Sequence, residues 1–167
     1  MNQVQKESYK NIVNLWQRMC DLHQALLETT AKEYYSLLSS ELENTEKILD
    51  EKKSLIEKIS IEEQNRKKLV NETLGPSSLD ENYTFRDLKK HFDQFEIERD
   101  GGHLNNFNLI LKDTIEKIKT QNKKNRIFIN RALISLDGLK LPSGESKEHS
   151  LYNKDGTKQR KLNVKGA

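Results

Sequence analysis

Apolar residues recur at steps of three and four over the first part of the chain, which is the spacing of an amphipathic helix. The positions are Ile12, Leu15, Trp16, Met19, Leu22, Leu26, Leu27, Tyr34, Leu37 and Leu38. The pattern predicts a helix over about residues 4–38. Ser40 and Glu43 then have the spacing of a capping box, in which both side chains satisfy free backbone N–H groups at a helix start. We therefore expect a tight reversal near Ser39 and Ser40, with one continuous long helix as the alternative.

A second apolar stripe predicts a helix over about residues 41–74. Its positions are Leu42, Ile48, Leu49, Leu55, Ile56, Ile59, Leu69 and Val70. An uninterrupted polar run from Glu62 to Lys68 breaks the stripe, so packing there is either weak or dependent on a partner. Gly75 suits a left-handed cap and Pro76 cannot continue a helix, so we expect the helix to end at this point.

A short helix is predicted over about residues 84–98. Thr84 and Asp87 have the spacing of a helix cap. The residues that share one face of this helix are Phe85, Leu88, Phe92 and Phe95. We expect these side chains to seal an end of a helical bundle.

The last long helix is predicted over about residues 104–139. Its apolar seam consists of Leu104, Phe107, Leu111, Ile115, Ile118, Ile129, Leu133 and Leu136. In the middle of the helix the same spacing falls on Asn122 and Asn125. Polar residues at seam positions cost stability and can fix helix register. A widened and hydrated section of the bundle is the other interpretation.

Together these elements predict an all-α fold, an elongated antiparallel bundle of three long helices with one short helix. The bundle takes up residues 1–139, and residues 140–167 form a flexible basic tail without apolar periodicity. Composition agrees with thin helices that have large exposed faces, because only 34% of the residues are hydrophobic and 33% are charged. The tail holds seven basic and three acidic residues, so it accounts for the net charge of +3.

No residue pattern in the sequence predicts an active site. The four histidines lie far apart and the single cysteine, Cys20, falls on an apolar stripe, so no zinc signature is present and a buried thiol is expected. Carboxylates alternate with lysines as on solvated helix faces. We therefore expect no enzyme activity, no cofactor, no nucleic-acid binding and no stable membrane insertion, and a cytoplasmic location.

Recognition of another protein is the function that remains. Long amphipathic helices with gaps in their stripes are able to receive a partner helix. In the tail, Leu151 and Tyr152 stand alone among charged residues in "SLYNKDGTKQRK". Tyrosine offers a large contact area at low entropic cost, which suits a docking point. The alternative is that Tyr152 folds back onto the bundle.

The layout resembles the FlgN family of flagellar type III export chaperones. In the first half of the chain the resemblance lies in a leucine-rich helix, a turn, and a helix that leads through "EEQNRKKLVNETLG" to a glycine. In the second half it lies in "NKKNRIFINRALISLDGL" followed by a spacer and "LYNKDG", in which a tyrosine precedes a glycine after the last helix.

The resemblance implies a cytoplasmic chaperone that binds hook–filament junction proteins of the FlgK and FlgL types, prevents their premature assembly and delivers them to the flagellar type III export gate. It implies that Asn125, Ile129, Leu133 and Leu136 contact the substrate protein. It also implies that Leu151 and Tyr152 dock on an export-gate component of the FlhA type. A generic coiled-coil adaptor or scaffold is the competing hypothesis.

Overall fold

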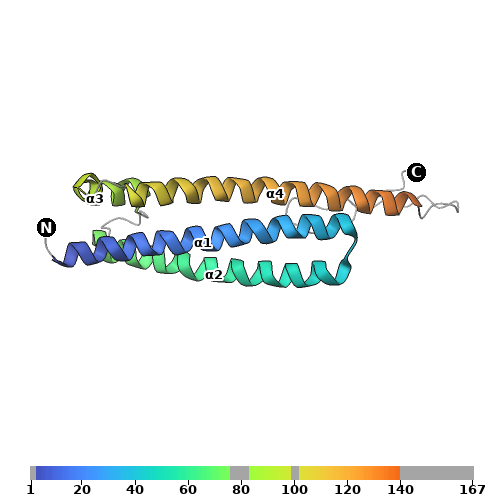
Figure 1. Ribbon diagram of the computed structural model, residues 1–167, viewed down its shortest axis with the longest axis horizontal. Helices are drawn as coiled ribbons and strands as arrows, with labels where there is room; N and C mark the ends of the chain where they lie inside the picture. Colours follow the sequence, from blue (N-terminus) through green and yellow to red (C-terminus); the bar gives the residue numbers. More distant parts are fainter. Residues whose placement is uncertain (1–2, 76–82, 99–101, 140–167) are drawn as a thin grey trace, which may run out of the picture. The chain divides into compact units, whose positions relative to one another are not determined.

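The computed structural model describes residues 3–75, 83–98 and 102–139, all within or beside helices. Four α-helices follow one another in the chain (Figure 1): α1 (Gln3–Ser39), α2 (Leu42–Leu74), α3 (Phe85–Glu98) and α4 (His103–Leu139). The predicted all-α fold of three long helices and one short helix is confirmed, and the bounds agree with those expected from the apolar periodicity. By its internal contacts the chain divides into two compact units, Met1–Asn130 and Arg131–Ala167, each described by itself below.

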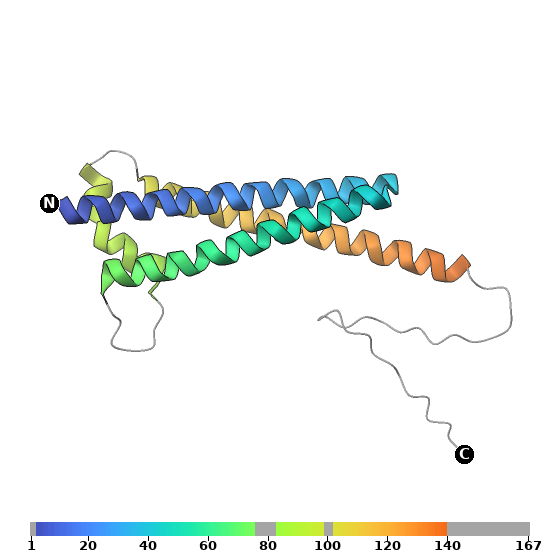
Figure 2. The ribbon, with the colours of Figure 1, turned by 90° about the horizontal axis from the view of Figure 1, so that it is seen from below.

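Within the first unit, α1 and α2 form an antiparallel pair that lies side by side in both views (Figures 1 and 2). The part of α4 in this unit runs parallel to α1, because Cys20 contacts Phe107 and Thr30 contacts Asn125. The predicted antiparallel arrangement of consecutive long helices is therefore present in this unit.

The reversal between α1 and α2 occurs at Ser39 and Ser40, as predicted, but the predicted capping box is wrong. Ser40 has a φ of 59°, and the N–H groups of Ser40 and Glu41 donate to the carbonyls of Leu37 and Ser36. This is a Schellman motif, which ends α1. Glu41 takes the N-cap position of α2 and makes no side-chain cap hydrogen bond. Because Ser40 is used to close the first helix, it is not available to cap the second.

The other two predicted helix boundaries follow their local chemistry. Gly75 ends α2 as predicted, but with φ 88° and ψ 169° it is not in the expected left-handed cap conformation; this is an extended conformation at positive φ that only glycine adopts readily. At the start of α3, the backbone N–H and the hydroxyl of Thr84 both donate to Asp87 Oδ2, at 2.9 and 2.6 Å. These hydrogen bonds lower the pKa of the Asp87 carboxyl and confirm the predicted cap. Pro76 lies outside the described residues.

The main apolar core joins all four helices of the first unit. Its buried members are Tyr9, Ile12, Leu15, Trp16, Met19, Cys20, Val70, Leu88, Phe92, Leu104 and Leu111. The aromatic face predicted for the short helix contributes to it, since Leu88 and Phe92 are buried and Phe92 packs edge-on against Tyr9 at 5.2 Å between ring centroids. Phe95 belongs to α3, but its side chain is not among those described.

The polar stretch predicted to interrupt the second stripe packs through charged side chains. Arg66 pairs with Glu63 at 2.6 Å, and its guanidinium lies over the Trp16 ring at 5.9 Å. Hydrogen bonding to Arg66 lowers the pKa of Glu63. Glu62 meets Arg18 of α1 at 3.3 Å. Charged groups of α2 therefore pack against α1 along the stretch in which α2 has no apolar residue.

Candidate functional site

The residues expected to contact the substrate protein all lie on α4, in different degrees of burial. In the first unit, Asn125 is 2% exposed and Ile129 is half-buried. In the second unit, Leu133 and Leu136 are 48% and 56% exposed. The two leucines therefore have apolar surface available for a partner, whereas Asn125 is already engaged inside the bundle.

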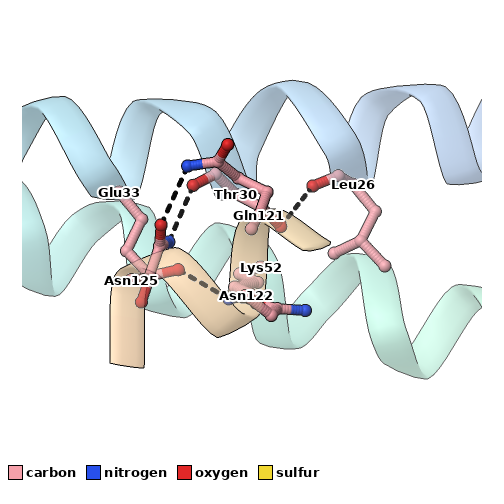
Figure 3. A network of polar contacts seen from close by, with 7 residues as sticks. All are labelled: Leu26, Thr30, Glu33, Lys52, Gln121, Asn122 and Asn125. Atoms are coloured by element: carbon pink, nitrogen blue, oxygen red, sulfur yellow. Dashed lines mark hydrogen bonds and ion pairs between the residues drawn. The ribbon is translucent and has the colours of Figure 1, made fainter. Parts of the chain in front are cut away.

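The amide of Asn125 ties α4 to α1 (Figure 3). Its Nδ2 donates to the carbonyl oxygen of Thr30 at 2.9 Å, and its Oδ1 accepts a hydrogen bond from Gln121 Nε2 at 3.0 Å. The Thr30 hydroxyl donates to the Leu26 carbonyl one turn earlier at 2.7 Å. Because buried amides are costly unless they are paired, these bonds specify one position of α4 against α1.

A second set of polar contacts ties α4 to α2. Lys52 Nζ lies 2.6 Å from Glu33 Oε2 of α1 and donates to Asn122 Oδ1 of α4 at 2.7 Å. One ammonium group of α2 thus links that helix to both α1 and α4 (Figure 3). The side chains of Lys52 and Glu33 are only 15% and 8% exposed. Of the two interpretations of Asn122 and Asn125, the structure favours specific polar contacts that fix register over a hydrated gap.

The character of the bundle interior changes along α1. A smaller apolar cluster of Leu26, Leu55 and Ile118 follows the main core. Toward the α1–α2 turn, the buried residues of α1 are polar: Thr29, Thr30, Glu33 and Ser36. Asn125 is the last buried residue of α4 among those whose burial is described. Between Ile118 and Asn130, α4 contacts α1 and α2 through the hydrogen bonds of Asn122 and Asn125 and through the ring contact of Phe128 with Tyr34.

Within the described ranges, no group of three or more His, Cys, Asp or Glu side chains is placed to hold a metal ion. Cys20 is buried as predicted, and its thiol donates to the Phe107 carbonyl at 3.2 Å. Desolvation raises the pKa of this thiol, which keeps it protonated and unreactive. His23 is also buried and hydrogen-bonded through Nδ1 to the Met19 carbonyl.

Two further parts of the molecule bear on the site. Leu151 and Tyr152, with the whole predicted tail, lie outside the described residues. The structure adds exposed apolar residues on α4 that the seam pattern does not include: Leu109 and Ile110 in its first half, and Ile127 at 41% and Ile134 at 68% in its second half. Ile127 and Ile134 are seven residues apart and lie on a different face of the helix from the predicted seam. A single apolar stripe therefore does not include them.

The described residues define a class of protein, an all-α protein with large apolar side chains exposed on its last long helix. Such exposed surface is typical of proteins that bind other proteins. A comparison with protein families supplies the particular family: the family model described as FlgN protein matches residues 1–160. The chain therefore belongs to the FlgN family, a family of flagellar export chaperones and not of enzymes.

The other comparisons add no relative. No curated protein and no solved structure was found to match the sequence. A search of the described helices for a membrane span found none long and apolar enough.

Proposed function

We propose that this FlgN-family protein acts in the cytoplasm as the chaperone of hook–filament junction proteins of the FlgK and FlgL types. It masks their helical segments before assembly and delivers them to an export-gate component of the FlhA type. The observation that carries the proposal is the exposure of Leu133 and Leu136, which keep the seam spacing of Ile129 but offer their side chains to solvent. An amphipathic helix of the substrate protein is the natural cover for such side chains.

The same proposal assigns different roles to the four seam residues. Leu133 and Leu136 make the apolar contacts with the substrate, and the half-buried Ile129 extends them. Asn125 acts through its hydrogen bond to Thr30, which holds the preceding part of α4 in register. Leu151 and Tyr152 provide the contact with the export gate. Binding and delivery then use separate side chains, so that a substrate already bound leaves the gate contact free.

Replacing Leu133 with aspartate is expected to weaken binding of a FlgK-type junction protein about tenfold or more, because it places a charge in an apolar contact. Helical content should stay near that of the wild type, since Leu133 is 48% exposed and not part of the core. Calorimetric titration of the full-length chain with the junction protein from the same cell measures the affinity, and circular dichroism measures the helical content.

Leu109→Asp is the matched control, because Leu109 lies on the same helix and is 56% exposed. It should bind within about twofold of the wild type, as expected of a surface change away from the contact. Global unfolding of Leu133→Asp would return Leu133 to the structural core. Absence of binding by the wild-type chain would refute the proposed function.

Replacing Tyr152 with alanine should leave the affinity for the junction protein within about twofold of the wild type while reducing its export, because only the gate contact loses its aromatic anchor. The measurement is the amount of junction protein secreted by cells that carry the variant, together with filament assembly. Normal secretion and normal filaments in these cells would contradict the docking role.

A further inference from the structure

The second half of α4 has a charge pattern that differs from the rest of the molecule. Between Lys117 and Leu136 the sequence contains no aspartate or glutamate. The basic residues in this segment are Lys117, Lys119, Lys123, Lys124, Arg126 and Arg131. In α2, by contrast, acidic and basic residues alternate and nearly balance. The net charge of the whole chain, only +3, does not reveal this basic segment.

The first two lysines of the segment are neutralised within the helix. Lys117 pairs with Asp113 at 2.7 Å and Lys119 pairs with Glu116 at 2.6 Å. Beyond Glu116 the next acidic residue is Asp137. The later basic residues, Lys123, Lys124, Arg126 and Arg131, therefore have no acidic residue three or four positions away. Ion pairs of this kind are how exposed helix faces usually balance their charge.

Lys123, Lys124, Arg126 and Ile127, all in the first unit, form what we call the α4 basic surface. All four side chains are exposed, and Ile127 has 41% of its surface accessible. None of the three basic groups forms an ion pair with a residue in the described part of the chain. Ile127 lies four residues after Lys123 and three after Lys124, so the apolar side chain has basic neighbours on its own helix face.

The polar contacts on the other side of α4 determine that this surface faces solvent. Gln121, Asn122 and Asn125 turn toward α1 and α2 and make the hydrogen bonds shown in Figure 3. With these positions directed inward, helix geometry directs Lys123, Lys124 and Ile127 outward. The amides that fix the register of α4 thereby also orient its basic residues.

We infer that the α4 basic surface binds an acidic amphipathic helix of the exported substrate protein. The inference rests on the proposed function and adds the chemistry of the partner: carboxylates that pair with Lys123, Lys124 and Arg126 around an apolar side chain that packs on Ile127. Charge complementarity of this kind selects the partner and speeds its association. Unlike the contact at Leu133, this contact depends on salt.

A helix fits this surface better than a membrane or a nucleic acid. The apolar part of the α4 basic surface is a single isoleucine, whereas helices that lie on membranes present a broad apolar face. Nucleic-acid surfaces without base specificity use exposed aromatic side chains for stacking. The aromatic residues of α4, Phe107 and Phe128, are partly buried, and Phe128 packs against Tyr34 at 5.9 Å between ring centroids.

The test compares two full-length variants that change the net charge equally. In the first, Lys123, Lys124 and Arg126 are each replaced by glutamate. In the control, the exposed α2 lysines Lys53, Lys58 and Lys67 are replaced in the same way.

Both variants are titrated by calorimetry with the FlgK-type junction protein at low and high NaCl concentrations. The α4 variant should bind about tenfold more weakly or worse at low salt, and the control within about twofold of the wild type. Glutamine at the three α4 positions should give an intermediate affinity.

Each other outcome has a distinct meaning. Equal and tight binding by the wild type and both variants would overturn this inference and leave the proposed function intact. An equal loss in both variants would overturn it too, because only net charge would then matter. No binding by the wild-type chain would overturn the proposed function and the inference with it. Binding of the wild type to phosphatidylglycerol vesicles that the α4 variant alone loses, with its affinity for the junction protein unchanged, would assign the surface to anionic lipid instead.

Discussion

Replacing Phe92 with alanine is expected to lower the free energy of unfolding by about 3–5 kcal/mol, the range for deleting a fully buried phenylalanine side chain. Phe92 is 0% exposed, packs edge-on against Tyr9 and belongs to the core that joins α3 to the long helices. Its loss would leave a cavity at the place where α3 is attached. Urea denaturation followed by circular dichroism measures the change.

Two variants on α3 control for this prediction. Phe92→Leu should cost less, about 1–2 kcal/mol, because most of the volume is kept. Lys89→Ala, at an exposed position of the same helix, should stay within about 0.5 kcal/mol of the wild type. A cost below about 1 kcal/mol for Phe92→Ala would mean that α3 contributes little to the stability of the bundle.

The helices themselves could be predicted from the sequence because each carries a regular apolar stripe. The periodicity of residues such as Ile12, Leu111 and Ile118 reflects their burial directly, and all three are in the core clusters. The cap at the start of α3 could also be predicted, because its two residues, Thr84 and Asp87, lie within one helical turn of each other. The four helices and the cap at Thr84 were therefore predicted correctly.

The turn at Ser40 shows where local reasoning fails. A serine followed three residues later by a glutamate fits a helix start, but a short polar residue is also tolerated in the left-handed conformation that ends a helix. The turn between α1 and α2 is so short that Ser40 can do only one of the two. Its backbone adopts the left-handed conformation and ends α1. Sequence alone offers no way to choose, because the decision depends on how tightly the two helices must turn.

The polar contacts around the candidate site could not be predicted for a different reason. The seam spacing identified Asn122 and Asn125 as polar residues at apolar positions. Their hydrogen-bond partners, Lys52 and Thr30, lie 70 and 95 residues away in the chain. Such pairings depend on how the helices are packed against each other. The acid-free run that includes Lys123 was present in the sequence, but a charge count over the whole helical part averages it away.

These polar contacts explain how α4 can hold its place in the bundle and still present the surface that we propose binds the substrate protein. An apolar seam throughout α4 would tolerate small shifts along the helix, because leucine and isoleucine contacts are not directional. The hydrogen bond that Asn122 accepts from Lys52 and the one that Asn125 donates to Thr30 form in only one register. In an export chaperone, a fixed register keeps the basic and apolar side chains of α4 in constant positions before the substrate binds, which reduces the cost of ordering them.

Replacing Lys52 with methionine is expected to lower the free energy of unfolding by about 3 kcal/mol. Methionine keeps the apolar stem but leaves the Glu33 carboxylate and the Asn122 amide oxygen without their cation. Removing one partner of a buried ion pair typically costs about 3–5 kcal/mol, and the remaining 15% exposure of Lys52 places this pair at the lower end. Urea denaturation of the full-length chain measures the loss.

The control for Lys52→Met is Lys53→Met, the same substitution at the adjacent exposed position, which should change stability by no more than about 0.5 kcal/mol. The double variant with leucine at both Glu33 and Lys52 should recover to within about 1 kcal/mol of the wild type, because no unpaired charge then stays buried. If Lys52→Met costs as little as Lys53→Met, water reaches Glu33 and the ion pair does not stabilise the bundle. If the double variant is stable but binds the junction protein more weakly, the polar contacts serve the register of α4 more than its stability.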